Sequence, residues 1–187
     1  MGKIWLVSDT HFGHQREFIY GPRGFDSIWE HDKQIIKNWN KLISWDDEVY
    51  HLGDVMLGDN SYGLSCLKQL SGQIHIIRGN HDTDARLELY KDCWNVVEIC
   101  EGKFLKYNGQ SFYLNHFPTL TSNLEKEPNI KSHIINLFGH THQKSKFYQD
   151  IPYMYCVGLD AHECKPICID DIIEDIKKEI KNCVKYL

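Results

Sequence analysis

Residues 4–11 read Ile4-Trp5-Leu6-Val7-Ser8-Asp9-Thr10-His11, a short apolar run that ends in a carboxylate and an imidazole. A short apolar run bounded by polar residues is typical of a buried strand. Four further polar motifs occur along the chain: Gly53-Asp54, Gly79-Asn80-His81-Asp82, His116 within Leu114-Asn115-His116-Phe117-Pro118, and Gly139-His140-Thr141-His142. Each of them follows another short apolar run. The sequence therefore predicts several strands that end in groups able to bind ligands or react.

The remaining pattern predicts a layered α/β fold. Strands are predicted at residues 4–8, 48–52, 73–78, 95–100, 103–107, 111–115, 133–138 and 154–157. The dipeptide Asn108-Gly109 predicts a tight hairpin between two of them. Helices are predicted at residues 27–44, 61–70 and 84–90, and after Pro166, where one apolar stripe runs from Ile169 to Val184. Strands that alternate with amphipathic helices are typical of layered α/β domains.

The polar motifs are expected to meet at one edge of the fold. In layered α/β proteins, ligands bind outside the carboxyl ends of the strands. Each motif directly follows a predicted strand, so its side chains should lie at such an edge. Glycines at positions 53, 79 and 139 would permit the sharp exits that these loops require. Polar residues of an ordinary packed core would instead be scattered along helix faces.

The gathered side chains form a ligand set for two neighbouring divalent cations, with two carboxylates, one amide oxygen and four imidazoles. Asp9 and His11 stand two residues apart, so an extended strand end would point both toward one cation. Asp54 has two carboxylate oxygens and can bridge both cations. Asn80 supplies an amide oxygen, which suits a hard cation. The two histidines of the 139–142 motif would more naturally serve different cations.

The order of these motifs, D-x-H, G-D, G-N-H-D, H and G-H-x-H, resembles the calcineurin-like metallophosphoesterase superfamily. Residues 8–14 and 50–55 are similar to a group of small stand-alone bacterial and phage phosphoesterases. The resemblance implies a four-layer α/β/β/α sandwich, and the length of 187 residues suits one domain spanning residues 1–187. It also implies that one metal is bound by Asp9, His11, Asp54 and His142, and the other by Asp54, Asn80, His116 and His140.

Two divalent cations and two aspartates leave a positive site that attracts phosphate even on an acidic protein. Our mechanistic hypothesis is in-line attack on phosphorus by a hydroxide that bridges the two metals. His81, next to Asn80, would protonate the leaving oxygen as general acid. Asp82 would either orient His81 or cap the helix predicted at 84–90. His14 would contact the substrate phosphate or make a structural hydrogen bond.

A phosphodiester is the favoured substrate, because the sequence shows no cluster of extra cations for a dianionic monoester. Phosphomonoesterase and nucleotide phosphohydrolase activities are alternatives, and a nuclease or a non-catalytic scaffold of the same fold are weaker ones. In serine/threonine phosphoprotein phosphatases the second motif continues as G-D-x-V-D-R-G. Residues 53–59 here read Gly53-Asp54-Val55-Met56-Leu57-Gly58-Asp59, which argues against protein-phosphatase activity. The natural substrate would depend on loops 12–26, 117–132 and 143–153.

Composition narrows the partners and the location. The formal charge of −5 argues against a dedicated nucleic-acid surface, so the expected partner is a small phosphoester. No stretch reaches membrane-spanning length, which favours a cytoplasmic protein without membrane association. The mixed Asp, His and Asn ligands suit manganese, iron or zinc, and a monomer or a dimer fits equally. The seven cysteines form no C-x-x-C pair and are predicted to be free thiols.

Overall fold

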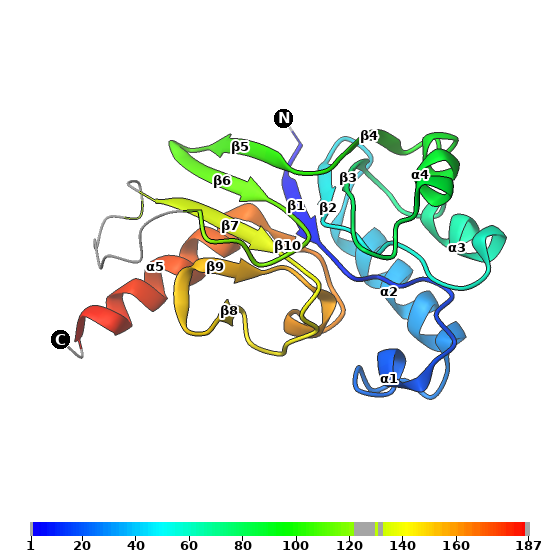
Figure 1. Ribbon diagram of the computed structural model, residues 1–187, viewed down its shortest axis with the longest axis horizontal. Helices are drawn as coiled ribbons and strands as arrows, with labels where there is room; N and C mark the ends of the chain where they lie inside the picture. The colour runs from blue at the N-terminus through cyan, green and yellow to red at the C-terminus, as the bar shows by residue number, and fades with distance from the viewer. Residues whose placement is uncertain (1, 122–129, 131–132, 186–187) are drawn as a thin grey trace.

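The computed structural model describes residues 2–121, 130 and 133–185, apart from the side chains of residues 182–185. The described strands form two five-stranded sheets (Figure 1). The first sheet has the order β10 (Ile167–Cys168), β1 (Ile4–Val7), β2 (Glu48–His51), β3 (Gln73–Ile77) and β4 (Val96–Cys100). Strands β1 to β4 run parallel, and β10 pairs antiparallel with β1.

The second sheet combines a hairpin with a parallel centre. Its order is β5 (Lys103–Tyr107), β6 (Gln110–Leu114), β7 (Ile134–Phe138), β9 (Ile151–Cys156) and β8 (Phe147–Tyr148). Strands β6, β7 and β9 are parallel, whereas β5 and β8 are antiparallel to their neighbours. Asn108 and Gly109 both adopt a positive φ between β5 and β6, as a two-residue hairpin of this kind requires. The predicted hairpin is confirmed.

Helices flank the sheets. They are α1 (Glu17–Tyr20), α2 (Ile28–Leu42), α3 (Asn60–Leu67), α4 (Asp84–Lys91) and α5 (Ile169–Lys185), with a 3₁₀ turn, η2 (Leu159–Ala161). Helix α2 begins where the Ser27 side chain accepts a hydrogen bond from the Glu30 N–H, which satisfies one free donor of the first turn. Helix α5 contacts β1, β9 and β10, and therefore ties the two sheets together.

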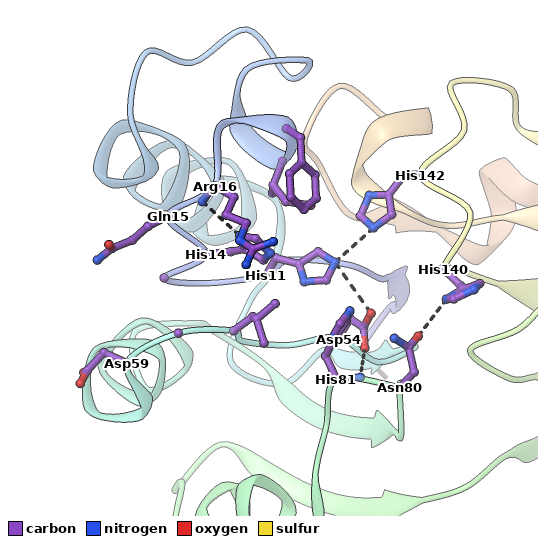
Figure 2. Close-up of a pocket in the computed structure, with 15 residues that line it drawn as sticks. His11, His14, Gln15, Arg16, Asp54, Asp59, Asn80, His81, His140 and His142 are labelled. Atoms are coloured by element: carbon purple, nitrogen blue, oxygen red, sulfur yellow. Dashed lines mark hydrogen bonds and ion pairs between the residues drawn. The ribbon is translucent and has the colours of Figure 1, made fainter.

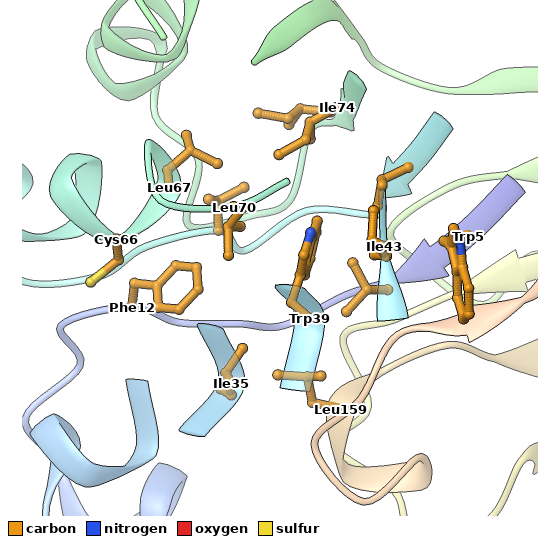
Figure 3. Packing of buried hydrophobic residues seen from close by; sticks show 14 of the residues in the cluster. Trp5, Phe12, Ile35, Trp39, Ile43, Cys66, Leu67, Leu70, Ile74 and Leu159 are labelled. Carbon is orange, nitrogen blue, oxygen red and sulfur yellow. The ribbon is translucent and has the colours of Figure 1, made fainter. Parts of the chain in front are cut away.

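The two largest apolar clusters hold the layers in place. The first packs α2, α3 and α4 on one face of the first sheet, around the fully buried Trp39 (Figure 3). The indole Nε1 of Trp39 donates to the Ser71 carbonyl at 2.8 Å, so the buried ring keeps its hydrogen bond. The second cluster lies between the sheets and includes Leu6, Phe112 and Ile172. The mixed α/β sandwich predicted from the sequence is confirmed.

Several details differ from the sequence-based expectation. Strands β8 and β10 and helix α1 are too short to produce a periodic pattern, and they were not predicted. Strand β9 begins at Ile151, three residues before the predicted start. Residues 122–129 and 131–132 of the predicted substrate loop 117–132 lie outside the described residues, as do the side chains of Cys183 and Val184.

In the described part of the chain, no helix combines the length and the apolar character needed to cross a membrane.

Candidate functional site

The polar motifs meet where strands of both sheets end. Asp9, Asp54 and Asn80 follow β1, β2 and β3, while His116 and His140 follow β6 and β7. Parallel neighbours end at the same edge of a sheet, so these loops lie side by side. The expected gathering of the motifs at one edge is what the structure shows.

Two groups of side chains there have donor atoms close enough to hold a metal ion. Asp9, His11 and His142 form one group, and Asp54, His116 and His140 form the other. Within each group the donor atoms lie within 4.8 Å of one another. The two histidines of the last motif fall in different groups, as expected.

Asp54 and Asn80 complete this arrangement. The Asp54 Oδ2 atom lies 3.8 Å from His11 Nε2 and 3.4 Å from His116 Nε2, so it faces both groups. The Asn80 Oδ1 atom lies 2.9 Å from His116 Nε2 and 2.8 Å from His140 Nδ1. Asn80 therefore joins the group of Asp54, His116 and His140. Figure 2 shows Asp54 between His11 and the Asn80 side chain.

The backbone of these motifs is left-handed rather than extended. Positive φ angles occur at five of the seven candidate ligands: Asp9, His11, Asp54, His140 and His142. The extended strand end expected for Asp9 and His11 is therefore wrong. Left-handed backbone is disfavoured for residues other than glycine, and it persists where surrounding contacts fix it, often at functional sites. The Asp9 and His11 N–H groups donate to the carbonyls of Gly53 and Asp54, both at 3.0 Å.

The glycines of two motifs are explained by close contact, not by turn geometry. A Cβ atom at Gly79 would lie 2.3 Å from Asp54 Oδ1, and one at Gly139 would lie 2.0 Å from the Ser8 hydroxyl oxygen. Neither glycine has a positive φ, whereas Gly53 does, at 91°. The expected sharp exit is thus confirmed at Gly53 only. Gly79 and Gly139 let neighbouring motif loops approach each other.

The residues present fit two divalent cations. Asp9 and Asp54 are each 1% exposed, and neither carboxylate has a Lys or Arg partner among the described residues. Buried carboxylates of this kind need a compensating positive charge, which a metal ion provides. The nitrogen atoms His11 Nε2 and His142 Nε2 face each other at 3.2 Å. A donor set of carboxylate, imidazole and amide groups without thiolates suits hard to borderline metals.

Local electrostatics differ among the candidate ligands, whereas a metal binds ionised carboxylates and neutral imidazoles. Burial raises the pKa of Asp54, but the hydrogen bond and charge of His116, with smaller contributions that include the His81 N–H, together outweigh it and hold the pKa below its ordinary value. Burial lowers the pKa of His11 well below its ordinary value, so its ring is neutral near pH 7. Burial raises the pKa of Asp9, and the charges of nearby histidines offset this only in part.

A cavity of about 810 Å³ opens beside the candidate ligands (Figure 2). His14, Arg16 and His81 line it, together with five of the candidate ligands: His11, Asp54, Asn80, His140 and His142. The backbone N–H of Arg16 donates to His14 Nδ1 at 3.2 Å. In the neutral ring, Nε2 of His14 therefore carries the hydrogen. His14 thus makes a structural hydrogen bond and also borders the cavity. The two sequence-based alternatives for His14 are compatible.

Asp82 has a different role from both alternatives derived from the sequence. Its carboxylate accepts hydrogen bonds from the N–H groups of Gly79, Asp54 and Val55 and from the Tyr90 hydroxyl, at 2.7–3.2 Å. Thr83, not Asp82, caps helix α4. Asp82 is fully buried and clamps the second motif to the third. A sequence shows which residues are adjacent, but it does not show these contacts between two loops.

Sequence reasoning missed Asp160, which contacts a candidate ligand directly. Its Oδ2 lies 3.0 Å from His142 Nδ1 and accepts from Arg23 Nη2 at 2.7 Å. Burial raises the pKa of Asp160, but the hydrogen bonds with His142 and Arg23 outweigh it and hold the pKa well below its ordinary value. One signal was present in the sequence: Asp160 closely follows strand β9, as the other motifs follow theirs.

Arg78 pairs with Asp84 and does not line the cavity.

The cysteines that the structure describes are consistent with the sequence-based expectation. The six cysteines described, all except Cys183, are free thiols. Among the described residues, His162, Cys164 and Cys168 do not form a metal-binding group. The ring of His162 instead contacts the Cys156 carbonyl at 2.8 Å.

Comparisons with known proteins agree with this architecture. The model of the calcineurin-like phosphoesterase superfamily domain matches residues 3–157. An uncharacterized protein of Methanocaldococcus jannaschii is 33% identical over 186 residues, covering 95% of this chain and 93% of the relative. The Gene 66 protein of Mycobacterium phage L5 is 34% identical over 185 residues, covering 86% and 88% of the two chains. A protein of unknown function from Aquifex aeolicus has a similar solved structure, with a TM-score of 0.68, 24% identity and 93% and 99% coverage.

The chain belongs to the calcineurin-like phosphoesterase superfamily. It is therefore a hydrolase that acts on phosphoester bonds, in a family whose activity depends on metals.

Proposed function

We propose that the protein is a dinuclear metal-dependent phosphodiesterase. The observation that carries this proposal is the position of Asp54 Oδ2, which lies 3.8 Å from one histidine of the first group and 3.4 Å from one of the second. Bound there, two divalent cations would activate water and neutralise charge on the phosphoryl group. Manganese, iron and zinc all suit the donors. The proposed ligands are Asp9, His11, Asp54 and His142 for one metal, and Asp54, Asn80, His116 and His140 for the other.

The cavity residues supply binding and proton transfer in this proposal. Arg16 and the Nε2–H of His14 bind the phosphate oxygens from one side. His81 lies on the cavity wall next to Asn80 and donates a proton to the leaving oxygen as general acid. Arg86 Nη1 donates to the His81 carbonyl at 2.7 Å, which fixes the backbone of the proposed acid.

The cationic groups of the cavity favour a diester over a monoester. Arg16 is the one Lys or Arg side chain among the described residues that line it. A phosphodiester carries one negative charge at neutral pH, whereas a monoester carries nearly two. A single arginine beside two metals matches the smaller charge. We propose a small diester as the substrate, acted on in the cytoplasm by a single domain formed by residues 1–187.

The test combines metal analysis with a substrate panel. Purified protein should hold two divalent metals per chain and, with manganese, cleave bis-nitrophenyl phosphate faster than nitrophenyl phosphate. It should then be tested on 2′,3′-cyclic nucleotides. Chelation and the Asp54→Asn variant should each abolish turnover. Faster monoester cleavage would replace the diesterase proposal by the phosphomonoesterase alternative, and salt-dependent binding to single-stranded nucleic acid would favour a nuclease.

A further inference from the structure

A buried ion pair lies directly behind His142. Asp160, in the 3₁₀ turn η2, accepts from Arg23 Nε at 3.0 Å and from Nη2 at 2.7 Å. The Arg23 side chain is 1% exposed and the Asp160 side chain 11%. The Asp160 oxygen that accepts from Nη2 is Oδ2, and this atom also lies 3.0 Å from Nδ1 of His142. We propose that Asp160, held by Arg23, is a positioning residue that orients His142 toward the metal; this inference rests on the proposed dinuclear site.

The contact with Asp160 selects which nitrogen of His142 faces the candidate metal position. A carboxylate only accepts hydrogen bonds, so Nδ1 of His142 carries the hydrogen and Nε2 keeps a free lone pair. That Nε2 lies 3.2 Å from His11 Nε2 and 3.9 Å from Asp9 Oδ1. A carboxylate that fixes the ring of a metal-binding histidine is a recurrent device in metal sites. His142 is 34% exposed, so packing alone restrains its ring little.

Arg23 fixes the carboxylate and links it to the first motif. Its Nε and Nη2 atoms donate to the two different oxygens of Asp160, and this bidentate contact sets the plane of the carboxylate. Nη2 also donates to the Asp9 carbonyl at 2.9 Å, and Nη1 lies 2.9 Å from His31 Nε2. One guanidinium thereby connects the loop after β1 with the turn after β9. These two segments supply or support all three members of the group that contains His142.

Among the residues that the structure describes, the second metal group has no equivalent of this ion pair. The Nδ1 atom of His116 contacts the Leu52 carbonyl at 2.7 Å, and Nδ1 of His140 contacts Asn80 Oδ1 at 2.8 Å. Neither contact involves Asp160 or Arg23. The inference therefore predicts an asymmetric effect: loss of Asp160 should weaken the metal bound by His142 and leave the other in place.

The test is manganese binding by the full chain carrying Asp160→Asn, measured by metal content after dialysis and by titration followed with electron paramagnetic resonance. We expect two manganese ions in the wild type, and in the variant one retained ion and one weakened about 10–100-fold. The control is Glu163→Gln, a residue just beyond η2 whose carboxylate pairs with Lys165. It should bind both ions as the wild type does. Two ions held with unchanged affinity in Asp160→Asn would overturn this inference alone, whereas a wild type without two ions would contradict the proposed function itself.

A second background separates positioning from a general structural role. If Asp160 acts through His142, Asp160→Asn should weaken manganese binding less than twofold when introduced into His142→Ala. A further large loss there, or loss of both ions together, would overturn the inference. Arg23→Lys keeps the buried positive charge but cannot form the bidentate contact with Asp160. It should reduce affinity at the same single site, and it serves as the test variant if Asp160→Asn does not fold.

Discussion

The carboxylate Oδ1 of Asp54 accepts a hydrogen bond from the backbone N–H of His81 at 2.8 Å. One oxygen of Asp54 is thus committed to the third motif, while Oδ2 faces the histidines of both metal groups. The contact fixes the rotation of the carboxylate and places the His81 backbone at a set distance from the metal-binding groups. The candidate general acid and the candidate bridging ligand therefore hold each other in position.

His81→Ala should slow the cleavage of substrates with poor leaving groups far more than that of nitrophenyl esters. A general acid contributes about 10²–10⁴-fold when the leaving oxygen needs a proton, and much less when the leaving anion is already stable. The measurement is kcat for an alkyl diester and for bis-nitrophenyl phosphate, with manganese. His75→Gln is the control, since His75 contacts Glu98 outside the cavity. Equal losses on both substrates would remove His81 from the role of acid.

Asp82→Asn should destabilise the protein by at least about 2 kcal/mol, because an amide nitrogen would face N–H groups that now have an acceptor. Its partners include the N–H groups of Gly79 and Asp54, so manganese affinity should fall as well. Tyr90→Phe is the matched control. It removes one hydrogen bond to the same carboxylate and should lower stability by about 1 kcal/mol with metal binding retained. Thermal unfolding measures the first effect and metal titration the second. Equal changes in the two variants would contradict the clamping role of Asp82.

Gly79→Ala should disrupt the metal centre although the added group is a single methyl. Its Cβ would lie 2.3 Å from Asp54 Oδ1, so the carboxylate must move. We expect loss of bound manganese and of activity in a protein that still folds. Gly109→Ala is the control: it has a positive φ of 78° but no atom within 4 Å of the added Cβ. That variant should lose about 1 kcal/mol of stability and keep both metals. Full metal content in Gly79→Ala would show that the loop relaxes around the methyl.

Much of the fold was predictable because its elements have strong periodic patterns. Strand β1 and helix α2 both have a clear apolar pattern, and the predicted boundaries lie within two residues of those observed. Strand β10 and helix α1 have two and four residues, which is too short for a periodic pattern to repeat. Strand β10 forms through its pairing with β1, a tertiary contact that a local pattern does not contain.

The candidate ligands were predictable because each follows a strand and offers a chemically distinctive group. Their supporting contacts were not. Asp160 contacts His142 across 18 positions of sequence, and Arg23 reaches Asp160 across 137. Asp82 follows the proposed acid directly, and this adjacency suggested an interaction with His81 that the fold does not use. The sequence identifies which side chains can bind a metal. Only the folded loops show which other residues hold those side chains in position.

Metal removal should lower the thermal stability of the protein, since the buried carboxylates Asp9 and Asp54 lose their compensating charge. A ligand at 100 times its dissociation constant stabilises by about 2.7 kcal/mol per site. In a chain of this length that corresponds to a midpoint shift of about 5–10 °C for one site. The measurement is thermal unfolding with manganese and with a chelator. The Asp54→Asn variant should show a much smaller manganese-dependent shift. An identical midpoint with and without metal in the wild type would argue against a built metal site.

Acid should weaken the hydrogen bonds that the Asp47 carboxylate accepts from the backbone of Lys3 and Ser44. Asp47 accepts hydrogen bonds from the Lys3 and Ser44 N–H groups at 2.6 and 2.9 Å. Burial raises the pKa of Asp47, but these bonds outweigh it and lower the pKa below 3.8. A carboxyl with a lowered folded pKa stabilises fully above its unfolded pKa, near 4, and this stabilisation is lost as pH falls through the folded pKa. Asp47→Asn should therefore cost about 2 kcal/mol at pH 7, and the difference from wild type should shrink below pH 4. Denaturant unfolding across this range, with exposed Asp46→Asn as control, measures the effect. A difference that stays constant down to pH 2 would show that the Asp47 carboxylate is not the stabilising form.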